Sequence, residues 1–243
     1  MKMNAYVAGV GMTPFGKHLD KPLKTLAGLA ILDALRDAGL QPGDLQAAWM
    51  GNAAAGVTVG QEMIRGQVAL RALGIGRIPV VNVEIACASS STALHQACAM
   101  VSAGLYDVVL ACGSEKLFHE DKLRTMGAFN GAVDVEDPKG ALKVLENMAQ
   151  AAGETFDAAG AGESRSVFMD IYGLMAKQHM RQYGTTREQF AMVGNGTERG
   201  SLEARFDPVF GGRPFTFGGD RVGQNLGAFI QDTFSPVEDL NIS

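Results

Sequence analysis

The chain has 243 residues, of which 47% are hydrophobic and 19% are charged. These proportions are typical of a globular protein that buries one large core or two modest ones. The formal net charge is −5 and the sequence has no run of Lys and Arg, so a nucleic-acid partner is disfavoured. Because no apolar stretch is long enough for a signal peptide or a transmembrane helix, we expect a cytoplasmic protein without a membrane span.

Strands and helices are predicted to alternate through the first half of the sequence, with short connections. The strands are continuous apolar runs rather than alternating ones, which is the pattern of a parallel sheet with helices on both faces. We therefore expect an α/β fold with a mixed, mostly parallel sheet. The predicted strands are residues 5–11, 45–50, 78–85 and 107–111, and the predicted helices are residues 23–38, 61–73 and 88–103.

The alternating pattern ends after Glu115. Residues 119–162 are rich in Gly, Ala and acidic residues, which predicts a loop-region excursion out of the sheet. A helix is expected over residues 166–183, and Thr185-Thr-Arg-Glu188 is a capping box that predicts another short helix. The apolar or aromatic stripe of the 166–183 helix is expected to consist of Phe168, Ile171, Tyr172, Met175 and His179.

From about residue 194 the sequence has Gly and Phe clusters and no clear period. We interpret residues 194–243 as a doubtful tail, a remnant of truncation or of a frameshift. The predicted division is then an α/β core at residues 1–118, a loop region with helices at residues 119–193, and this tail.

Cys87 stands where the apolar run of residues 78–85 gives way to a helix of small residues. A thiol at a helix start lies near unpaired backbone N–H groups and the positive end of the helix dipole, which favour the thiolate. The thiolate is the form that attacks a carbonyl carbon, so Cys87 is a candidate catalytic nucleophile. The alternative is a small apolar residue packed at a helix start, which is a common environment for a free cysteine.

The other chemically active side chains are weaker candidates. Cys98 and Cys112 are expected in the core, and the three cysteines are odd in number and lack metal-ligand spacing, so no metal site is predicted. His95 is about 12 Å along the helix from Cys87, too far for proton transfer. His119 follows the fourth predicted strand and so shares a sheet edge with Cys87, but nothing fixes its distance from the thiol, and a solvent-facing loop histidine is the favoured interpretation.

Six segments of the chain carry motifs in a fixed order. The nucleophile segment reads Asn82-Val-Glu-Ile-Ala-Cys87-Ala-Ser-Ser-Ser-Thr-Ala-Leu94, and the others are residues 7–17, 50–52, 113–116, 163–172 and 183–190. Together they resemble the thiolase superfamily, most closely the branch of sterol-carrier-protein-x type thiolases and archaeal acetyl-CoA acetyltransferases. The resemblance runs from about residue 4 to about residue 193.

This resemblance implies the first of two similar α/β halves in a five-layered sandwich, with the Cys87 helix between the sheets. It implies that Cys87 attacks an acyl-CoA thioester to give an acyl-enzyme. The substrates are coenzyme A thioesters and no bound cofactor is expected. In the family the activating histidine, the second cysteine and an asparagine come from the second half. None of the four histidines of this chain stands in a matching motif, so we expect little or no turnover from this chain alone.

Three functions therefore compete at this stage. The first is a thiolase-like acyl-CoA C-acyltransferase, and the second is a thiolase-fold scaffold or acyl-CoA-binding protein without turnover. The third is a hydrolase that uses a Cys87–His119 pair. The resemblance also implies a homodimer through the strand around Pro79 to Val83, where an unpaired apolar edge would be prone to aggregation. A small zinc-binding, acyl-CoA-binding partner protein is a further expectation from the same branch.

Overall fold

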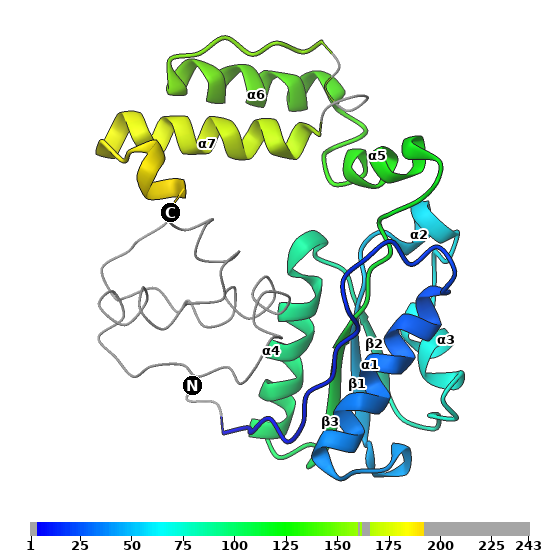
Figure 1. Ribbon diagram of the computed structural model, residues 1–243. Helices are drawn as coiled ribbons and strands as arrows, with labels where there is room; N and C mark the ends of the chain where they lie inside the picture. The colour runs from blue at the N-terminus through cyan, green and yellow to red at the C-terminus, as the bar shows by residue number, and fades with distance from the viewer. Residues whose placement is uncertain (1–3, 160, 162–165, 192–243) are drawn as a thin grey trace. The chain divides into compact units, whose positions relative to one another are not determined.

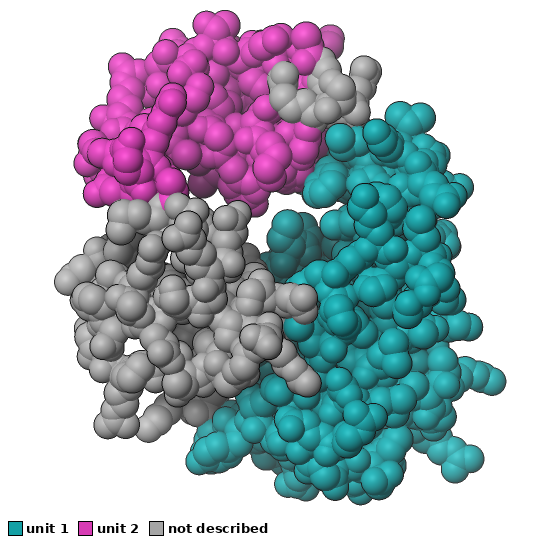
Figure 2. All heavy atoms as spheres, viewed as in Figure 1, with its two compact units in different colours: residues 1–132 teal, residues 133–243 magenta. Residues whose placement is uncertain are grey.

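The structure is a computed structural model that describes residues 4–159, 161 and 166–191. The chain divides into two compact units, residues 1–132 and residues 133–243, which Figure 2 distinguishes by colour. The predicted tail at residues 194–243 lies outside the described residues. Among the described residues, no helix is both long enough and apolar enough to cross a membrane.

The first unit is built on a parallel sheet (Figure 1). Its strands are β1 (Ala47–Gly51), β2 (Val80–Val83) and β3 (Val109–Gly113), in the order β2-β1-β3. β1 is central and all five of its residues are buried. Ala48 of β1 lies opposite Val80 of β2 and Leu110 of β3. β2 is an edge strand, and two of its four residues are exposed.

Helices cover both faces of this sheet because successive β1 residues point to opposite sides. On one face, α1 (Leu23–Ala38) and α3 (Arg65–Arg71) pack against Ala48 and Met50. On the other face, α4 (Ser89–Ser102) packs against Trp49 through its buried Ala93 and Ala97. The expected α/β fold, a parallel sheet between layers of helices, is confirmed.

The loop-region excursion contains more regular structure than its composition indicates. α5 (Lys122–Asn130) belongs to the first unit, and α6 (Pro138–Ala152) and α7 (Val167–Tyr183) belong to the second. α6 and α7 pack side by side through Ala149, Ala152 and Leu174 (Figure 1). The smaller elements of the first unit are α2 (Ala55–Val59) and two 3-10 turns, at Pro42–Asp44 and Ala86–Ala88.

The prediction of a strand at residues 5–11 is wrong. Residues 4–15 form no strand, and the side chains of Tyr6 and Val7 are 90% and 69% exposed. The segment is held to helices instead. The Asn4 N–H donates to the Ser102 hydroxyl of α4 (2.8 Å), and the Val10 N–H donates to an Asp37 carboxylate oxygen of α1 (2.9 Å). An apolar run becomes a strand only where another strand offers it a hydrogen-bonding edge. Among the described residues, the Asn4 and Val10 amides instead donate to side chains of helices.

The predicted buried faces of two helices, α4 and α7, are also wrong, because both sequences have apolar residues on more than one face. On α4 the buried residues are Ser89, Ala93 and Ala97, whereas Cys98, expected in the core, is only half-buried. Small residues face the sheet because they let the helix approach it closely.

On α7 the buried residue is Leu174, and the expected stripe residues Tyr172 and Met175 are about half exposed, at 53% and 51%. The capping box lies one residue later than expected. The Thr186 N–H donates to Gln189 Oε1 (2.8 Å) and the Gln189 N–H donates to Thr186 Oγ1 (3.3 Å). The predicted helix at residues 61–73 is shorter, beginning at Arg65 after Ile64 in the left-handed region (φ 49°).

Candidate active site

Cys87 is the middle residue of a 3-10 turn, Ala86–Ala88, that links β2 to α4. Its side chain is exposed, so neither burial in hydrocarbon nor a mid-helix position keeps a reagent from the sulfur. Ala86 has φ 43°, in the left-handed region that residues with a Cβ rarely adopt. A residue held in that region costs about 1–3 kcal/mol, and such residues cluster at functional sites.

Side-chain hydrogen bonds hold this turn in place. The Ser89 hydroxyl accepts from the Ile85 N–H (2.9 Å) and donates to the Ala86 carbonyl oxygen (2.7 Å). Glu84 Oε1 accepts from the Ala86 N–H (2.6 Å). Ser89 itself is only 4% exposed, and loss of its hydroxyl would remove the hydrogen-bond partner of the Ile85 N–H and of the Ala86 carbonyl oxygen. Two side chains thus determine the backbone path on either side of Cys87.

Two glycines at the ends of strands let α4 begin directly against the sheet. A Cβ added to Gly51, the last residue of β1, would lie 2.8 Å from backbone atoms of Ser89 and Ser90. A Cβ added to Gly113, the last residue of β3, would overlap the Ser90 side chain. The start of α4 therefore packs on the carboxyl ends of β1 and β3, the edge at which parallel α/β sheets bind their ligands.

A polar network at the same edge joins two of the sequence motifs. The Asn52 side-chain amide donates to the Ser114 carbonyl oxygen (2.6 Å) and to Glu115 Oε1 (3.1 Å). The Glu115 carboxylate in turn accepts the N–H groups of Ala53 (2.8 Å) and Ala54 (3.2 Å). Asn52 is 6% exposed whereas Glu115 is exposed, so this network ties the buried end of β1 to the surface loop after β3.

Arg65 closes the network from α3. Its guanidinium donates to the carbonyl oxygens of Asn52 (2.9 Å) and Gln61 (3.0 Å). A cavity of about 290 Å³ opens beside it, lined by Gly51, Asn52, Arg65 and apolar residues of α1 and α3. This edge of the sheet therefore offers both a fixed polar frame and a space for a small ligand.

Among the described residues, no hydrogen bond joins His119 to Cys87. His119 Nδ1 accepts from the Asp121 N–H (2.9 Å), and Cys87 has no hydrogen-bond partner among the described residues. His95 is exposed on α4, as expected for the helix surface. No group of three or more His, Cys, Asp or Glu side chains within residues 4–159, 161 and 166–191 could hold a metal ion.

The two remaining cysteines differ from Cys87 in exposure. Cys98 and Cys112 are half-buried, and burial raises the pKa of the Cys112 thiol to about 12. At neutral pH, a thiol with that pKa carries roughly three orders of magnitude less thiolate than one near 8.5.

We expect iodoacetamide near neutral pH to label Cys87 faster than Cys98 and at least about 100-fold faster than Cys112, because alkylation needs an accessible thiolate. Peptide mass spectrometry at timed intervals measures the three rates. Labelling of Cys112 should rise with pH up to about pH 12. Equal, slow labelling of all three cysteines would contradict a nucleophilic role for Cys87.

The sequence pointed to Cys87 as a candidate nucleophile but not to the residues that hold its turn. No motif marks Ser89 or Glu84 for this role, and the left-handed Ala86 has no signature in the sequence. Gly51 and Gly113 did carry a usable signal, since each follows an apolar run at the predicted end of a strand. A glycine at that place indicates a close approach of another backbone.

A profile of the family described as Thiolase, N-terminal domain, matches residues 5–194. The chain is 36% identical over 187 residues to "Acetyl-CoA acetyltransferase" of Methanothermobacter thermautotrophicus, covering 77% of this chain and 42% of that protein. It is 33% identical over 199 residues to "Sterol carrier protein 2" of Bos taurus, covering 80% of this chain and 32% of the relative.

Among solved structures, one described as "Ltp2-ChsH2(DUF35) aldolase" has a TM-score of 0.51 at 22% identity and covers 86% of this chain and 46% of that one. This likeness concerns the fold. The chain spans less than half the length of these curated relatives.

Proposed function

The chain belongs to the thiolase family, and on that premise we propose that it carries the nucleophile half of an acyl-CoA C-acyltransferase, with Cys87 as the residue that is acylated. The observation that supports this role is the exposed sulfur on a turn fixed by Ser89 and Glu84 at the carboxyl edge of a parallel sheet. The substrates are coenzyme A thioesters.

The proposed step is an attack of the Cys87 thiolate on the thioester carbonyl carbon. A new carbon–sulfur bond forms, the carbonyl oxygen takes the negative charge, and coenzyme A leaves as its thiolate when the tetrahedral intermediate collapses. Because the attacking and departing groups are both thiolates, the free-energy change of the transfer is close to zero and the reaction runs in either direction. The product is an acyl group on Cys87.

Formation or cleavage of a carbon–carbon bond would follow from this acyl-enzyme, in the presence of a second acyl-CoA. That step needs a base at the α-carbon, and the described residues place no histidine or second cysteine in hydrogen-bond contact with Cys87. We propose that those groups come from a second thiolase half. Turnover by this chain alone is then expected to be low, since a missing base and missing oxyanion donors each cost about 10²–10⁴-fold.

The second candidate is a thiolase-fold protein that binds acyl-CoA without reacting. The absence of a hydrogen-bond partner for Cys87 Sγ among the described residues favours it, because an unassisted thiol reacts slowly. The hydrolase with a Cys87–His119 pair finds no such support, since His119 Nδ1 is already engaged by the Asp121 N–H.

Intact-mass spectrometry of the 243-residue chain after incubation with acetyl-CoA distinguishes these functions. We expect one acetyl group per chain, mapped to Cys87, with stoichiometric release of coenzyme A in a single burst and no continued turnover. Binding of acetyl-CoA without a covalent adduct would support the non-reacting protein and contradict the acyl-enzyme. Continued hydrolysis after the burst would support the hydrolase.

Assembly is part of the proposal. β2 is an edge strand with Val81 exposed at 41%, so the strand around Pro79 to Val83 is proposed to pair with a second copy. A small zinc-binding, acyl-CoA-binding protein remains a proposed partner. The family resemblance supports this partner, and a protein of similar fold has a description that names a DUF35 component.

A further inference from the structure

A pocket in the first unit stands apart from the Cys87 turn. It has a volume of about 310 Å³, close to the lower limit for small-ligand sites. None of residues 84–90 lines it. Its walls come from Leu19 before α1, from Thr58 and Val59 at the end of α2, and from the segment 116–124 after β3.

Basic groups outnumber acidic ones in this pocket. Lys116, His119 and Arg124 line it together with a single carboxylate, Glu120. Arg124 has no ion-pair partner among the described residues and is exposed. A cavity with two permanent positive charges and one negative charge attracts an anion from solution.

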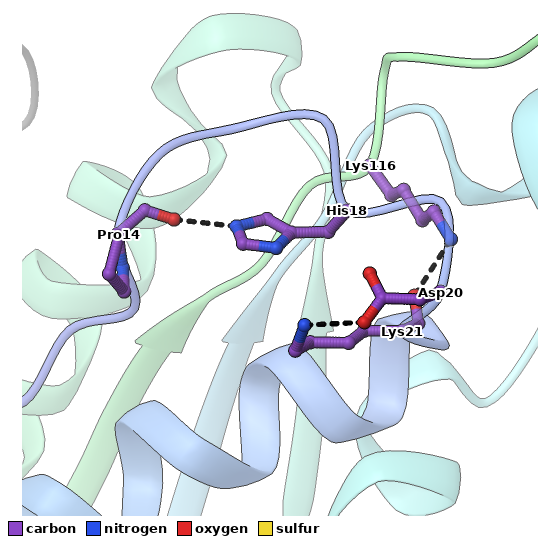
Figure 3. A network of polar contacts seen from close by, with 5 residues as sticks. All are labelled: Pro14, His18, Asp20, Lys21 and Lys116. Carbon is purple, nitrogen blue, oxygen red and sulfur yellow. Dashed lines mark hydrogen bonds and ion pairs between the residues drawn. The ribbon is translucent and has the colours of Figure 1, made fainter.

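Each basic side chain retains hydrogen-bond donors for a ligand. Lys116 Nζ uses one N–H on the Lys21 carbonyl oxygen (2.7 Å), which leaves two (Figure 3). His119 Nδ1 accepts from the Asp121 N–H, so the neutral ring carries its hydrogen on Nε2 and can donate it. The guanidinium of Arg124 offers a planar fork that matches two oxygens of one phosphoryl group.

Contacts of the N-terminal loop hold one wall of the pocket. His18 Nε2 lies 2.7 Å from the Pro14 carbonyl oxygen, and Lys21 forms an ion pair with Asp20 (2.6 Å), as Figure 3 shows. Lys17 Nζ lies 4.8 Å from the centre of the Phe118 ring. The loop that carries Leu19 is thus fixed to the segment after β3 at two places, Lys116 and Phe118.

We propose that this pocket binds a phosphoryl group through Lys116, His119 and Arg124. The tetrahedral oxygens of a phosphoryl group can accept from a primary ammonium, an imidazole N–H and a guanidinium that approach from different directions, which a planar carboxylate does less well. The group comes either from free phosphate or from the nucleotide end of coenzyme A. The site does not depend on acyl transfer, and its test uses no reaction at Cys87.

Isothermal titration of the full chain with inorganic phosphate, and separately with adenosine 3′,5′-bisphosphate, tests the proposal. We expect saturable one-to-one binding that Arg124→Gln weakens about tenfold and that Glu120→Gln tightens, because the two variants remove opposite charges from the pocket. Arg71→Gln is the matched control, since Arg71 is an exposed helical arginine outside the pocket, and should leave the affinity unchanged.

The outcomes separate the sources and the alternatives. Affinities within about twofold for the two ligands assign the site to free phosphate, and a bisphosphate affinity at least about tenfold higher assigns it to the nucleotide. If Arg124→Gln and Arg71→Gln weaken ligand binding equally, the effect comes from the net charge of the chain, and the proposed site is contradicted. Absence of saturable binding by either ligand would also overturn it. Circular dichroism of each variant confirms that it is folded.

Discussion

Replacing Cys87 with serine is expected to abolish acetylation of the chain by acetyl-CoA, with a loss of at least about 10²-fold in adduct formation. A serine hydroxyl is almost fully protonated at neutral pH and needs a base to attack a thioester, and no base contacts this position among the described residues. The measurement is the mass of the intact chain after timed incubation. The free energy of unfolding should change by no more than about 0.5 kcal/mol, because the Cys87 side chain is exposed.

Cys98→Ser is the matched control, since Cys98 lies on α4 and is half-buried. It should leave the acetylation rate within about twofold of the unchanged chain, because Cys98 lies outside the turn that carries Cys87 and its half-buried sulfur is less accessible to acetyl-CoA. Equal acetylation of Cys87→Ser and the unchanged chain would show that another nucleophile takes the acyl group. The proposed function would then be lost, whereas the fold assignment would remain.

Replacing Gly51 with alanine is expected to destabilise the chain by about 1–3 kcal/mol, the usual cost of forcing extra volume into a packed contact. The added Cβ would lie 2.8 Å from the backbone of Ser89 and Ser90, which cannot rotate away as a flexible side chain could. The start of α4 must shift, and the turn that carries Cys87 shifts with it. Urea unfolding followed by circular dichroism gives the free energy.

Gly43→Ala provides the control for this substitution. Gly43 has no heavy atom within 4 Å of an added Cβ, so alanine there should be neutral or stabilising by up to about 1 kcal/mol. The rate of Cys87 alkylation should change in Gly51→Ala and stay constant in Gly43→Ala. A destabilised Gly51→Ala chain with an unchanged alkylation rate would mean that Gly51 supports packing but does not position the nucleophile.

The structure also explains how the network around Asn52 relates to the site. Asn52 and Glu115 belong to motifs that the sequence presents as separate turns, each after its own strand. Parallel pairing of β1 and β3 brings Gly51 opposite Gly113 and so places the following residues side by side. Their hydrogen bonds hold the carboxyl edge of the sheet, while Ser89 holds the turn above it.

Several features were determined by the sequence alone because their signals are local. The helix at residues 23–38 was predicted residue for residue, since its apolar stripe has a helical period and Gly39 ends it in the left-handed conformation. The alternation of strands and helices from β1 to β3 and the place of Cys87 between a strand and a helix follow from similar short-range patterns. Each signal lies within a few residues of the structure that it specifies.

Other features were decided by tertiary structure because they depend on partners distant along the chain. Residues 5–11 have the composition of a strand, yet they form none: the Val10 N–H donates to a side chain of α1, and the N–H of the preceding Asn4 donates to a side chain of α4. The buried face of α4 is set by how closely the sheet approaches it, which selected Ala93 and Ala97 over larger residues. Ala86 adopts a left-handed conformation because the hydrogen bonds of Glu84 and Ser89 outweigh its intrinsic preference, and no pattern in the sequence encodes that balance.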